Sequence, residues 1–386
     1  MRLLICAGGT GAGVYPALAV LQAARNELFA ATDSGNIKAP EVSMLWVGSE
    51  GGMEADLVMR AGLPYTSIPA AGVHGVGMRA LPGNLWRLLR GFFASRRILH
   101  KFDPDVLFFT GGYVAVPMAA ASRLSYRHGK RPRSLLYVPD IEPGLALKTL
   151  ARFADQIAVT VDSTPALLPG SARMVVTGYP TRPDLAVWER LQARQALGLA
   201  PDLPTVLVVG GSSGARSINR AVFAVLPELL GDVQVVHISG RLDWPEVEKA
   251  QQRLVIELPA ALQQRYRAFP YLHAEMGAAL AAADLAISRA GASCIGEFPL
   301  FGLPALLVPY PHAWRYQVVN ARYLEQRGAA VMVADADLPA QLLPSVRRLL
   351  GDPQSLAKMQ EAMRALAQPQ AAGKIAEMIR SLDTSR

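Results

Sequence analysis

The sequence has little of what a disulfide-stabilised, membrane-spanning or metal-binding protein requires. Only two of its 386 residues are cysteines, Cys6 and Cys294, and both have apolar neighbours, which argues against a disulfide scaffold and favours a reducing compartment. No apolar run reaches the roughly 18 residues that a membrane-spanning helix needs, and the N-terminal MRLLICAGG lacks the pattern of a signal peptide. The six histidines show no spacing typical of metal ligands, so we expect neither a metal nor another cofactor.

The composition is that of a globular protein with an anionic partner. Apolar residues make up 51% of the chain and charged residues 18%, and a length of 386 residues is typical of two domains. The net charge of +8 favours nucleic acid, an anionic membrane or a polyanionic small molecule as partner. No nucleic-acid-binding motif accompanies the basic residues, so we expect no nucleic acid partner.

Short apolar runs alternate with helical patterns through both halves of the chain. The runs lie at 3–7, 44–48, 105–112, 134–140, 155–160, 205–211, 233–240, 284–288 and 304–311. The helical patterns include 85–101, 143–154 and the tail 353–386. This alternation predicts an α/β fold with doubly wound parallel sheets.

The two halves of the sequence repeat each other. LLICAGGTGAG opens the first half and VLVVGGSSGAR opens the second, so that Gly8 and Gly210 occupy equivalent positions. We therefore expect two Rossmann-like domains, residues 1–180 and 181–386, with a cleft between them that both glycine-rich loops face. The helical tail is a candidate to return to the first domain.

Neither glycine-rich loop matches a standard nucleotide motif. The G-x-G-x-x-G fingerprint fails in the first loop because Val14 stands at its third glycine, and the second loop has the spacing G-G-x-x-G. No Gly-Lys-Ser/Thr of a Walker loop occurs. Glycines before a helix still let backbone N–H groups approach an anion, so two matching loops favour phosphate binding over tight turns without a ligand. The same spacings disfavour a nicotinamide oxidoreductase.

A third stretch of small residues follows the run at 284–288. It reads Arg-Ala-Gly-Ala-Ser from Arg289 to Ser293 and leads into a predicted helix that carries Glu297. Glu297 lies too far into this helix to repel a phosphate at the tip, and its carboxylate can accept both hydroxyl protons of a ribose. The alternative is an ordinary acid that the helix dipole favours near a helix start.

Five stretches together resemble one bacterial family. They are GGTGAGVYPALAV (8–20), FFTGGYVAVP (108–117), VTGYPTR (176–182), VVGGSSGAR (208–216) and residues 283–330. The chain resembles the cell-wall glycosyltransferases that add N-acetylglucosamine to the undecaprenyl-pyrophosphate-linked muramoyl pentapeptide. The resemblance implies the GT-B fold, which has two Rossmann-like domains with a nucleotide-sugar cleft between them. It also implies inverting transfer from UDP-N-acetylglucosamine to this lipid-linked acceptor in peptidoglycan synthesis.

By this resemblance the donor lies mainly on the second domain. The positions that would contact it are Arg182, Ser212, Ala292, Ser293, Cys294, Ile295, Gly296, Glu297 and Gln317. Among these, Glu297 matches the family's ligand of the ribose hydroxyls. Thr10, Gly11 and Ala12 would lie near the transferred sugar and the acceptor pyrophosphate, and Thr10 and Gly11 would take part in the reaction.

Two departures from the family pattern concern the general base. The family usually has histidine where this chain has Gly13, and its His-Glu-Gln-Asn run aligns with residues 137–140, where Asp140 alone keeps a polar group of similar size. Inverting transfer needs a base for the acceptor hydroxyl, and Asp140 is the first candidate, followed by His74 and Glu142. Because the altered run belongs to the acceptor-side domain, an enzyme that uses a different lipid or polyol acceptor stays an alternative. Because Gly13 replaces the histidine, a protein that binds the nucleotide sugar without turnover is a further alternative.

Residues 85–102 combine an apolar stripe with a row of cations. The stripe is Leu85, Leu88, Leu89, Phe92 and Phe93, and the cations are Arg87, Arg90, Arg96, Arg97 and Lys101. The pattern suits either a core-facing stripe with a solvated basic face or an anionic membrane surface. The resemblance favours the membrane, and with it a peripheral place on the cytoplasmic face of the cell membrane.

Asp103-Pro104-Asp105 has the form of a metal-binding D-x-D motif. It lies at the amino end of the run at 105–112, whereas ligands of such sheets bind at the carboxyl end. We therefore interpret it as a turn between a helix and a strand.

Overall fold

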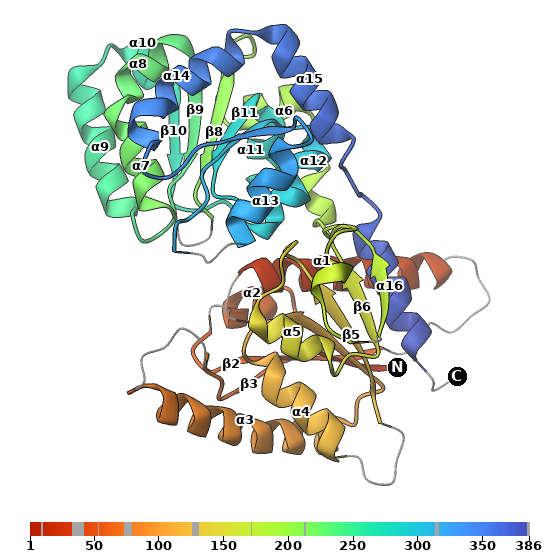
Figure 1. Ribbon diagram of the computed structural model, residues 1–386. Coiled ribbons are helices and arrows are strands. Elements are labelled where there is room, and N and C mark those ends of the chain that lie inside the picture. The colour runs from red at the N-terminus through yellow and green to blue at the C-terminus, as the bar shows by residue number, and fades with distance from the viewer. Residues whose placement is uncertain are drawn as a thin grey trace. The chain divides into compact units, whose positions relative to one another are not determined.

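The computed structural model describes residues 1–8, 11–32, 42–52, 54–72, 79–125, 131–170, 172–211, 214–312 and 316–383. The chain divides into two compact units (Figure 1). The N-unit is formed by Met1–Arg182 together with Pro369–Arg386, and the C-unit by Pro183–Gln368. The sequence had suggested a division after residue 180, with a tail that returns to the first domain.

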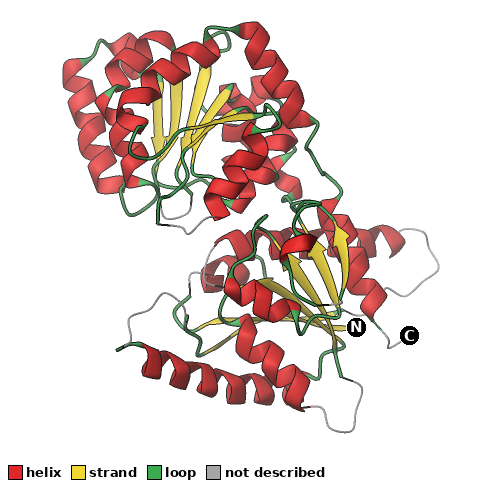
Figure 2. Ribbon diagram, viewed as in Figure 1, coloured by secondary structure: helices red, strands yellow, loops and turns green. Residues whose placement is uncertain are grey.

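The N-unit is a parallel sheet with helices on both faces (Figure 2). The strand order is β3-β2-β1-β4-β5-β6-β7, and the pairings are parallel. The strands are β1 (Arg2–Ala7), β2 (Ser43–Ser49), β3 (Tyr65–Ile68), β4 (Val106–Gly111), β5 (Arg133–Val138), β6 (Gln156–Val159) and β7 (Arg173–Val176). The helices are α1 (Gly11–Thr32), α2 (Glu54–Arg60), α3 (Leu81–Phe102), α4 (Ala115–Ser125), α5 (Leu145–Ala151), the 3₁₀ turn η1 (Pro165–Leu167) and α16 (Ala371–Leu382), which packs against α1.

The C-unit repeats this architecture with the strand order β10-β9-β8-β11-β12-β13, again in parallel. Its strands are β8 (Thr205–Val209), β9 (Gln234–Ile238), β10 (Tyr266–Phe269), β11 (Leu285–Ser288), β12 (Ala305–Leu307) and β13 (Ala330–Met332). Its helices are η2 (Pro183–Leu185), α6 (Arg190–Ala196), α7 (Arg216–Ala224), α8 (Leu226–Asp232), α9 (Trp244–Glu257), α10 (Ala260–Gln263), α11 (Met276–Ala282), η3 (Ala292–Ile295), α12 (Glu297–Phe301), α13 (Tyr316–Glu325), α14 (Leu338–Leu350) and α15 (Pro353–Arg364).

These sheets confirm the predicted doubly wound α/β fold. Each predicted apolar run contains or overlaps a strand, and the interior strands β1, β4, β8 and β9 are buried along nearly their whole length because helices cover both faces of each sheet. Runs such as 304–311 extend past the end of their strand, here β12, into the loop that follows.

Strand order reverses at an equivalent point in each unit. In the N-unit the chain moves from β1 outward to β3 and then returns to β4 on the other side of β1; in the C-unit β8 and β11 are related in the same way. Loops that leave the carboxyl ends of two such strands diverge and open a crevice, which is where ligands of these folds bind. The two glycine-rich loops follow β1 and β8, so both lie at a switch point.

The D-x-D sequence lies at the opposite, amino edge of the N-unit sheet. Asp103 ends α3 in the left-handed conformation (φ 46°), and Asp105 precedes β4. Arg2 donates from its backbone N–H to Asp105 Oδ2 (2.6 Å) and from its guanidinium to Asp103 Oδ2 (2.8 Å). The prediction of a helix-to-strand turn is confirmed.

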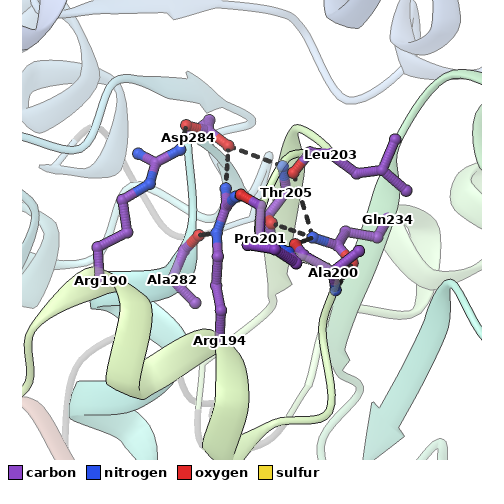
Figure 3. Close-up of polar contacts among 9 residues, drawn as sticks. All are labelled: Arg190, Arg194, Ala200, Pro201, Leu203, Thr205, Gln234, Ala282 and Asp284. Atoms are coloured by element: carbon purple, nitrogen blue, oxygen red, sulfur yellow. Dashed lines mark hydrogen bonds and ion pairs between the residues drawn. The ribbon is translucent and has the colours of Figure 1, made fainter.

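A buried polar cluster closes the amino edge of the C-unit sheet (Figure 3). Arg194, which is 2% exposed, donates to Asp284 Oδ2 (2.7 Å) and to the carbonyl of Ala282 (3.1 Å). Asp284 also accepts the N–H of Thr205 (2.8 Å), and Arg190 pairs with its other oxygen. The cluster therefore fastens α6 and the stretch before β8 to the start of β11.

The side chain of Gln234 forms hydrogen bonds with backbone groups of the loop between α6 and β8. Its Nε2 donates to the carbonyls of Ala200 (2.7 Å) and Leu203 (3.1 Å), and its Oε1 accepts the N–H of Ala200 (2.9 Å). Gln234 is buried, whereas Ala200 is exposed and Leu203 is partly buried. Gln234→Leu removes these hydrogen bonds, so we expect the free energy of unfolding to fall by about 2 kcal/mol.

Urea denaturation measures this loss. Arg347→Ala is the control, because it breaks an ion pair with Asp232 in which both side chains are about half exposed, and such pairs contribute about 1 kcal/mol or less. Equal losses in the two variants would contradict the structural role given to Gln234.

Candidate active site

A pocket of about 1030 Å³ opens at the carboxyl edge of the C-unit sheet. Its walls are formed by the loops after β8, β9, β11, β12 and β13, and the switch point between β8 and β11 lies among them. A volume near the upper end of the usual range for small-molecule sites is sufficient for a ligand of nucleotide-sugar size. Within the ranges described above, no group of three or more His, Cys, Asp or Glu side chains is placed to hold a metal ion.

The first wall of the pocket is the glycine turn between β8 and α7. A Cβ on Gly210 would lie 2.4 Å from the backbone nitrogen of Ala215. Gly214 has a φ of +83°, and its Cβ would lie 2.3 Å from the carbonyl oxygen of Ser239. Glycine is therefore required for the turn to pack this closely and to deliver the chain into α7. Ser212, a predicted donor contact, lies outside the described residues.

The second wall is the segment between β11 and α12. Residues Ala292 to Ile295 form the 3₁₀ helix η3, and Glu297 is the first residue of α12 rather than a residue further inside a single helix. Ser293 and Glu297 line the pocket. The side chains of Ala292, Cys294 and Ile295 are buried, so a role for these three in ligand binding is limited to their backbone groups. Gly296 joins the two helical turns.

Gln317 lies in the first turn of α13 and lines the pocket. Its Oε1 accepts the backbone N–H of Tyr310 at 2.8 Å. This hydrogen bond fixes the orientation of the amide, with Nε2 on the side away from Tyr310. The structure thus brings Ser293, Glu297 and Gln317 to one pocket, and their predicted contacts with a donor remain predictions.

Arg289 organises the floor of the pocket. Its guanidinium pairs with Asp335 after β13, donates to Ser217 Oγ (2.7 Å) and to the carbonyl of Val308 (3.0 Å), and lies over the ring of Tyr310 at 5.2 Å. Its side chain is 10% exposed. Arg289 therefore joins the loops after β8, β11, β12 and β13 into one rigid frame.

A buried chain of hydrogen bonds runs beneath the first wall. Arg216 Nε donates to Asp243 Oδ1 (3.0 Å), and Asn219 Nδ2 donates to Asp243 Oδ2 (3.0 Å). Asn219 Oδ1 contacts His237 Nε2 (2.9 Å), and His237 Nδ1 contacts the hydroxyl of Tyr266 (2.8 Å). Burial lowers the pKa of His237 from 6.5 to about 3, so the imidazole is neutral at physiological pH.

This neutral histidine makes stability depend on pH. The unfolded chain protonates His237 below pH 6.5, whereas the folded protein does so only near pH 3. Its contribution to stability is therefore present above pH 6.5 and is lost at about 1.4 kcal/mol per pH unit as the pH falls toward 3. Denaturation between pH 7.5 and 5 should show a steeper loss in wild type than in His237→Gln, and parallel curves would contradict the assignment.

In the N-unit, two glycine turns meet at the switch point between β1 and β4. Gly112 has a φ of +85°, and a Cβ there would lie 2.4 Å from the carbonyl oxygen of Gly8. A Cβ on Gly8 would lie 2.3 Å from Oε1 of Glu54, a fully buried carboxylate that accepts the N–H and Oγ–H of Ser49, both at 2.6 Å. Burial and the charge of Glu54 raise the pKa of the nearby Tyr65 to about 12.

The predicted residues of the first loop are only partly described. Gly11 is buried and begins α1. Thr10 and the side chain of Ala12 lie outside the described part of the chain. Gly13, which replaces the family's histidine, is buried against β4, and its carbonyl accepts Thr110 Oγ1 at 2.6 Å.

Asp140 lies at the carboxyl edge of the same sheet, two residues after β5 ends. It is partly buried, as is Glu142. Tyr137 belongs to the core instead: it is fully buried, and its hydroxyl contacts Thr160 Oγ1 at 2.9 Å. Of the altered run at 137–140, Asp140 is thus the one titratable residue placed at the ligand-binding edge. The third candidate base, His74, lies outside the described residues.

Arg182 is the last residue of the first segment of the N-unit. Its guanidinium lies over the ring of Tyr15 in α1 at 5.1 Å. This contact ties the end of the VTGYPTR stretch to the helix that follows the first glycine-rich loop. Its predicted contact with the donor remains a prediction.

Sequence reasoning missed several pocket residues. Arg216, Asp243, Tyr310 and Asp335 line the pocket, yet none was among the predicted site residues. One signal was available for Tyr310, since polar residues shortly after buried strands in an α/β sheet lie at the ligand-binding edge. Asp335 was not predicted as a site residue, because the short strand before it, β13, was not predicted from the sequence.

The comparison with known families agrees with this architecture. The family model of the glycosyltransferase family 28 N-terminal domain matches residues 3–159. The model of the family 28 C-terminal domain matches residues 205–376. A relative from Roseiflexus sp. is 41% identical over 95% of this chain and 91% of its own length. It is named UDP-N-acetylglucosamine–N-acetylmuramyl-(pentapeptide) pyrophosphoryl-undecaprenol N-acetylglucosamine transferase. This chain belongs to the same family.

Further comparisons extend to structure. A transferase of the same name from Desulforudis audaxviator is 37% identical over 95% of this chain and 94% of its own length. The crystal structure of MurG from Acinetobacter baumannii superimposes with a TM-score of 0.71 at 27% identity, covering 98% of this chain and 99% of that one. The family membership predicted from the sequence is confirmed, and the two Rossmann-like units are those of the GT-B fold.

Proposed function

We propose that this protein transfers N-acetylglucosamine from UDP-N-acetylglucosamine to the muramoyl sugar of the undecaprenyl-pyrophosphoryl pentapeptide precursor, a step of peptidoglycan synthesis. One observation carries the proposal: a pocket of about 1030 Å³ at a sheet switch point, walled by a glycine turn and by Glu297, in a chain that is 41% identical along its length to a transferase named for this reaction. The reaction class is hexosyl transfer.

The donor is assigned to the C-unit pocket. Arg216, the first residue of α7, lines the pocket, and the start of this helix suits the diphosphate, since helix starts carry partial positive charge. Glu297 suits the ribose, because an ionised carboxylate accepts two hydroxyl protons at once. Gln317, held by the N–H of Tyr310, suits the hydroxyls of the sugar.

The chemistry requires a proton acceptor and stabilisation of the leaving group. In an inverting transfer the acceptor hydroxyl attacks the anomeric carbon from the face opposite UDP, so one C–O bond forms as the bond to the β-phosphate oxygen breaks. We assign the proton of the attacking hydroxyl to Asp140, at the carboxyl edge of the N-unit sheet. Negative charge that develops on UDP is balanced by N–H groups and by arginine in the pocket.

An assay with a panel of acceptors tests this function. Purified protein is incubated with radiolabelled UDP-N-acetylglucosamine and, separately, with the lipid-linked muramoyl pentapeptide, undecaprenyl phosphate or a polyol. We expect label to move to the muramoyl acceptor alone. Label on another acceptor would establish a different glycosyltransferase, and donor binding without transfer to any acceptor would establish a binder.

We also propose that α3 docks the protein on an anionic membrane surface. The predicted stripe is divided in the structure: Phe92 packs against the core and Leu88 is partly buried. The fully buried positions of the helix are Gly91, Ser95 and Leu99. The exposed apolar residues are Leu81, Leu85, Trp86, Leu89 and Phe93, each more than 40% exposed, and the five predicted cations are exposed as well. A helix with this combination binds the interface of anionic bilayers. Among the described helices, none is long and apolar enough to span a bilayer.

Replacing two of these exposed residues should release the protein from vesicles. For Trp86→Ser combined with Phe93→Ser, we expect binding to vesicles with about one third anionic lipid to weaken about tenfold or more, because two large side chains no longer enter the interface. Co-sedimentation measures the change. Ile256→Ser is the control, since Ile256 on α9 of the C-unit is 85% exposed, and equal losses in both proteins would contradict docking through α3.

A further inference from the structure

We propose that Arg216 is the cation that holds the diphosphate of the donor, and that the buried chain Asp243–Asn219–His237–Tyr266 behind it fixes its position. This inference rests on the proposed function, since it assigns a further binding residue within the same pocket.

Among the residues that the structure describes, three arginines line the pocket: Arg216, Arg220 and Arg289. The donors of Arg289 are committed to Asp335, Ser217 and Val308, so it serves as a frame. Arg220 lies one turn further along α7, beyond the glycine turn, near Glu246.

Arg216 differs from both. It is the first residue of α7 and follows the glycine turn directly. Its guanidinium donates through Nε to Asp243, while 59% of the side chain remains exposed. Its terminal amino groups therefore remain accessible directly beside the turn where a phosphate is expected, whereas Arg220, whose side chain is 64% exposed, lies one turn further along α7.

The hydrogen bonds behind Arg216 have a single consistent direction. Asn219 Nδ2 reaches two acceptors, the carbonyl of Ser239 and Asp243 Oδ2, both at 3.0 Å, which assigns the amino group to that end of the amide. Asn219 Oδ1 must then accept from His237 Nε2–H. In a neutral imidazole the other nitrogen is an acceptor, so Nδ1 receives the hydroxyl proton of Tyr266.

Every donor in the chain thus points toward the carboxylate of Asp243. Tyr266, His237, Asn219 and Asp243 are all less than 7% exposed, so these bonds form in a medium of low dielectric, where aligned bonds reinforce one another. Asp243 is held with one oxygen on Asn219 and the other on Arg216. The arginine is therefore pre-positioned at the pocket wall, and a diphosphate loses less affinity to the cost of ordering it.

Calorimetric titration with UDP and with uridine tests the assignment of Arg216. For Arg216→Gln we expect the affinity for UDP to fall about 10- to 100-fold, the range of a lost charge-assisted hydrogen bond, while the affinity for uridine stays unchanged because uridine carries no phosphate. Arg220→Gln, on the same helix, is the matched control and should change UDP affinity less than about threefold. An unchanged affinity for UDP in Arg216→Gln, or an equal loss for uridine, would overturn the assignment.

Tyr266→Phe tests the chain behind the arginine, since it removes one hydroxyl and keeps the ring. We expect UDP affinity to fall about three- to fivefold in the wild-type background and not at all when Arg216→Gln is already present, as expected for residues that act through one another. A loss that persists without Arg216, or that extends to uridine, would mean that Tyr266 is only structural. If wild-type protein binds no UDP, the proposed function itself fails; if it binds and Arg216→Gln binds equally, only this inference fails.

Discussion

Replacing Asp140 with asparagine is expected to lower kcat for N-acetylglucosamine transfer by about 10²- to 10⁴-fold, the range that a general base contributes. Asp140 follows β5 at the carboxyl edge of the N-unit sheet and is partly buried. Asparagine keeps the size of the side chain and removes the proton acceptor. The affinity for UDP-N-acetylglucosamine should stay the same, because the donor is assigned to the C-unit. Steady-state kinetics with the lipid-linked acceptor measure the change.

Glu142→Gln provides the matched control for this experiment. Glu142 is also partly buried and lies two residues further along the same loop, and we expect its loss to change kcat less than about threefold. A wild-type acidic limb in the pH profile of kcat that disappears in Asp140→Asn would support the assignment. Loss of activity in Glu142→Gln with near-normal activity in Asp140→Asn would move the base to Glu142.

Replacing Glu297 with alanine is expected to weaken binding of UDP-N-acetylglucosamine about 100-fold. Glu297 begins α12 and lines the C-unit pocket. Two hydrogen bonds from ribose hydroxyls to a carboxylate contribute about 1.5 kcal/mol each or more, and 1.4 kcal/mol corresponds to a factor of ten. Isothermal titration calorimetry measures the affinity.

A deoxygenated ligand shows whether the carboxylate acts on the ribose. Wild-type protein should bind 2′-deoxy-UDP more weakly than UDP, whereas Glu297→Ala should bind the two ligands nearly equally, because the partner of the 2′-hydroxyl is already gone. If Glu297→Ala still prefers UDP by the wild-type factor, Glu297 does not contact the ribose. It would then be an acid that the helix dipole favours at the start of α12.

The interior of both sheets was predictable from the sequence, and the edges were not. Strands at interior positions, such as β1 and β8, have neighbours on both sides and helices on both faces, so their sequences are continuous apolar runs. The edge strands β3, β7, β10 and β13 have one free side. They are three or four residues long and mostly only partly buried, so YTSI and RMVV do not stand out from loops.

The sequence pattern also did not determine which face of α3 is buried. A 3.6-residue period identifies an apolar stripe but not what covers it. In the structure α3 approaches the loop after β3 closely: a Cβ on Gly91 would lie 2.2 Å from the carbonyl oxygen of Pro69. Phe92 and Ile98 pack against the core beside this contact. Close packing through Gly91 and Ser95 leaves Trp86 and Phe93 exposed. Of the predicted stripe, Leu85, Leu89 and Phe93 are exposed and Phe92 packs against the core, so neither interpretation describes the whole stripe.

The glycine turns of the site were predictable because their spacing is local, whereas the pocket's ionic frame was not. Arg289 and Asp335 are 46 residues apart, and they meet because β11 and β13 end at the same edge of one sheet. Arg216 and Asp243 meet in the same way after β8 and β9. Partners of this kind depend on strand order, which no local pattern in the sequence contains.

The central claim is that the C-unit pocket holds the uridine diphosphate sugar. A crystal structure of the protein with UDP-N-acetylglucosamine tests it most directly. We expect the nucleotide at the carboxyl edge between β8 and β11, with both ribose hydroxyls on the Glu297 carboxylate and the diphosphate beside the start of α7. Density for the nucleotide at any other place on the protein, or a ribose that does not contact Glu297, would contradict the account.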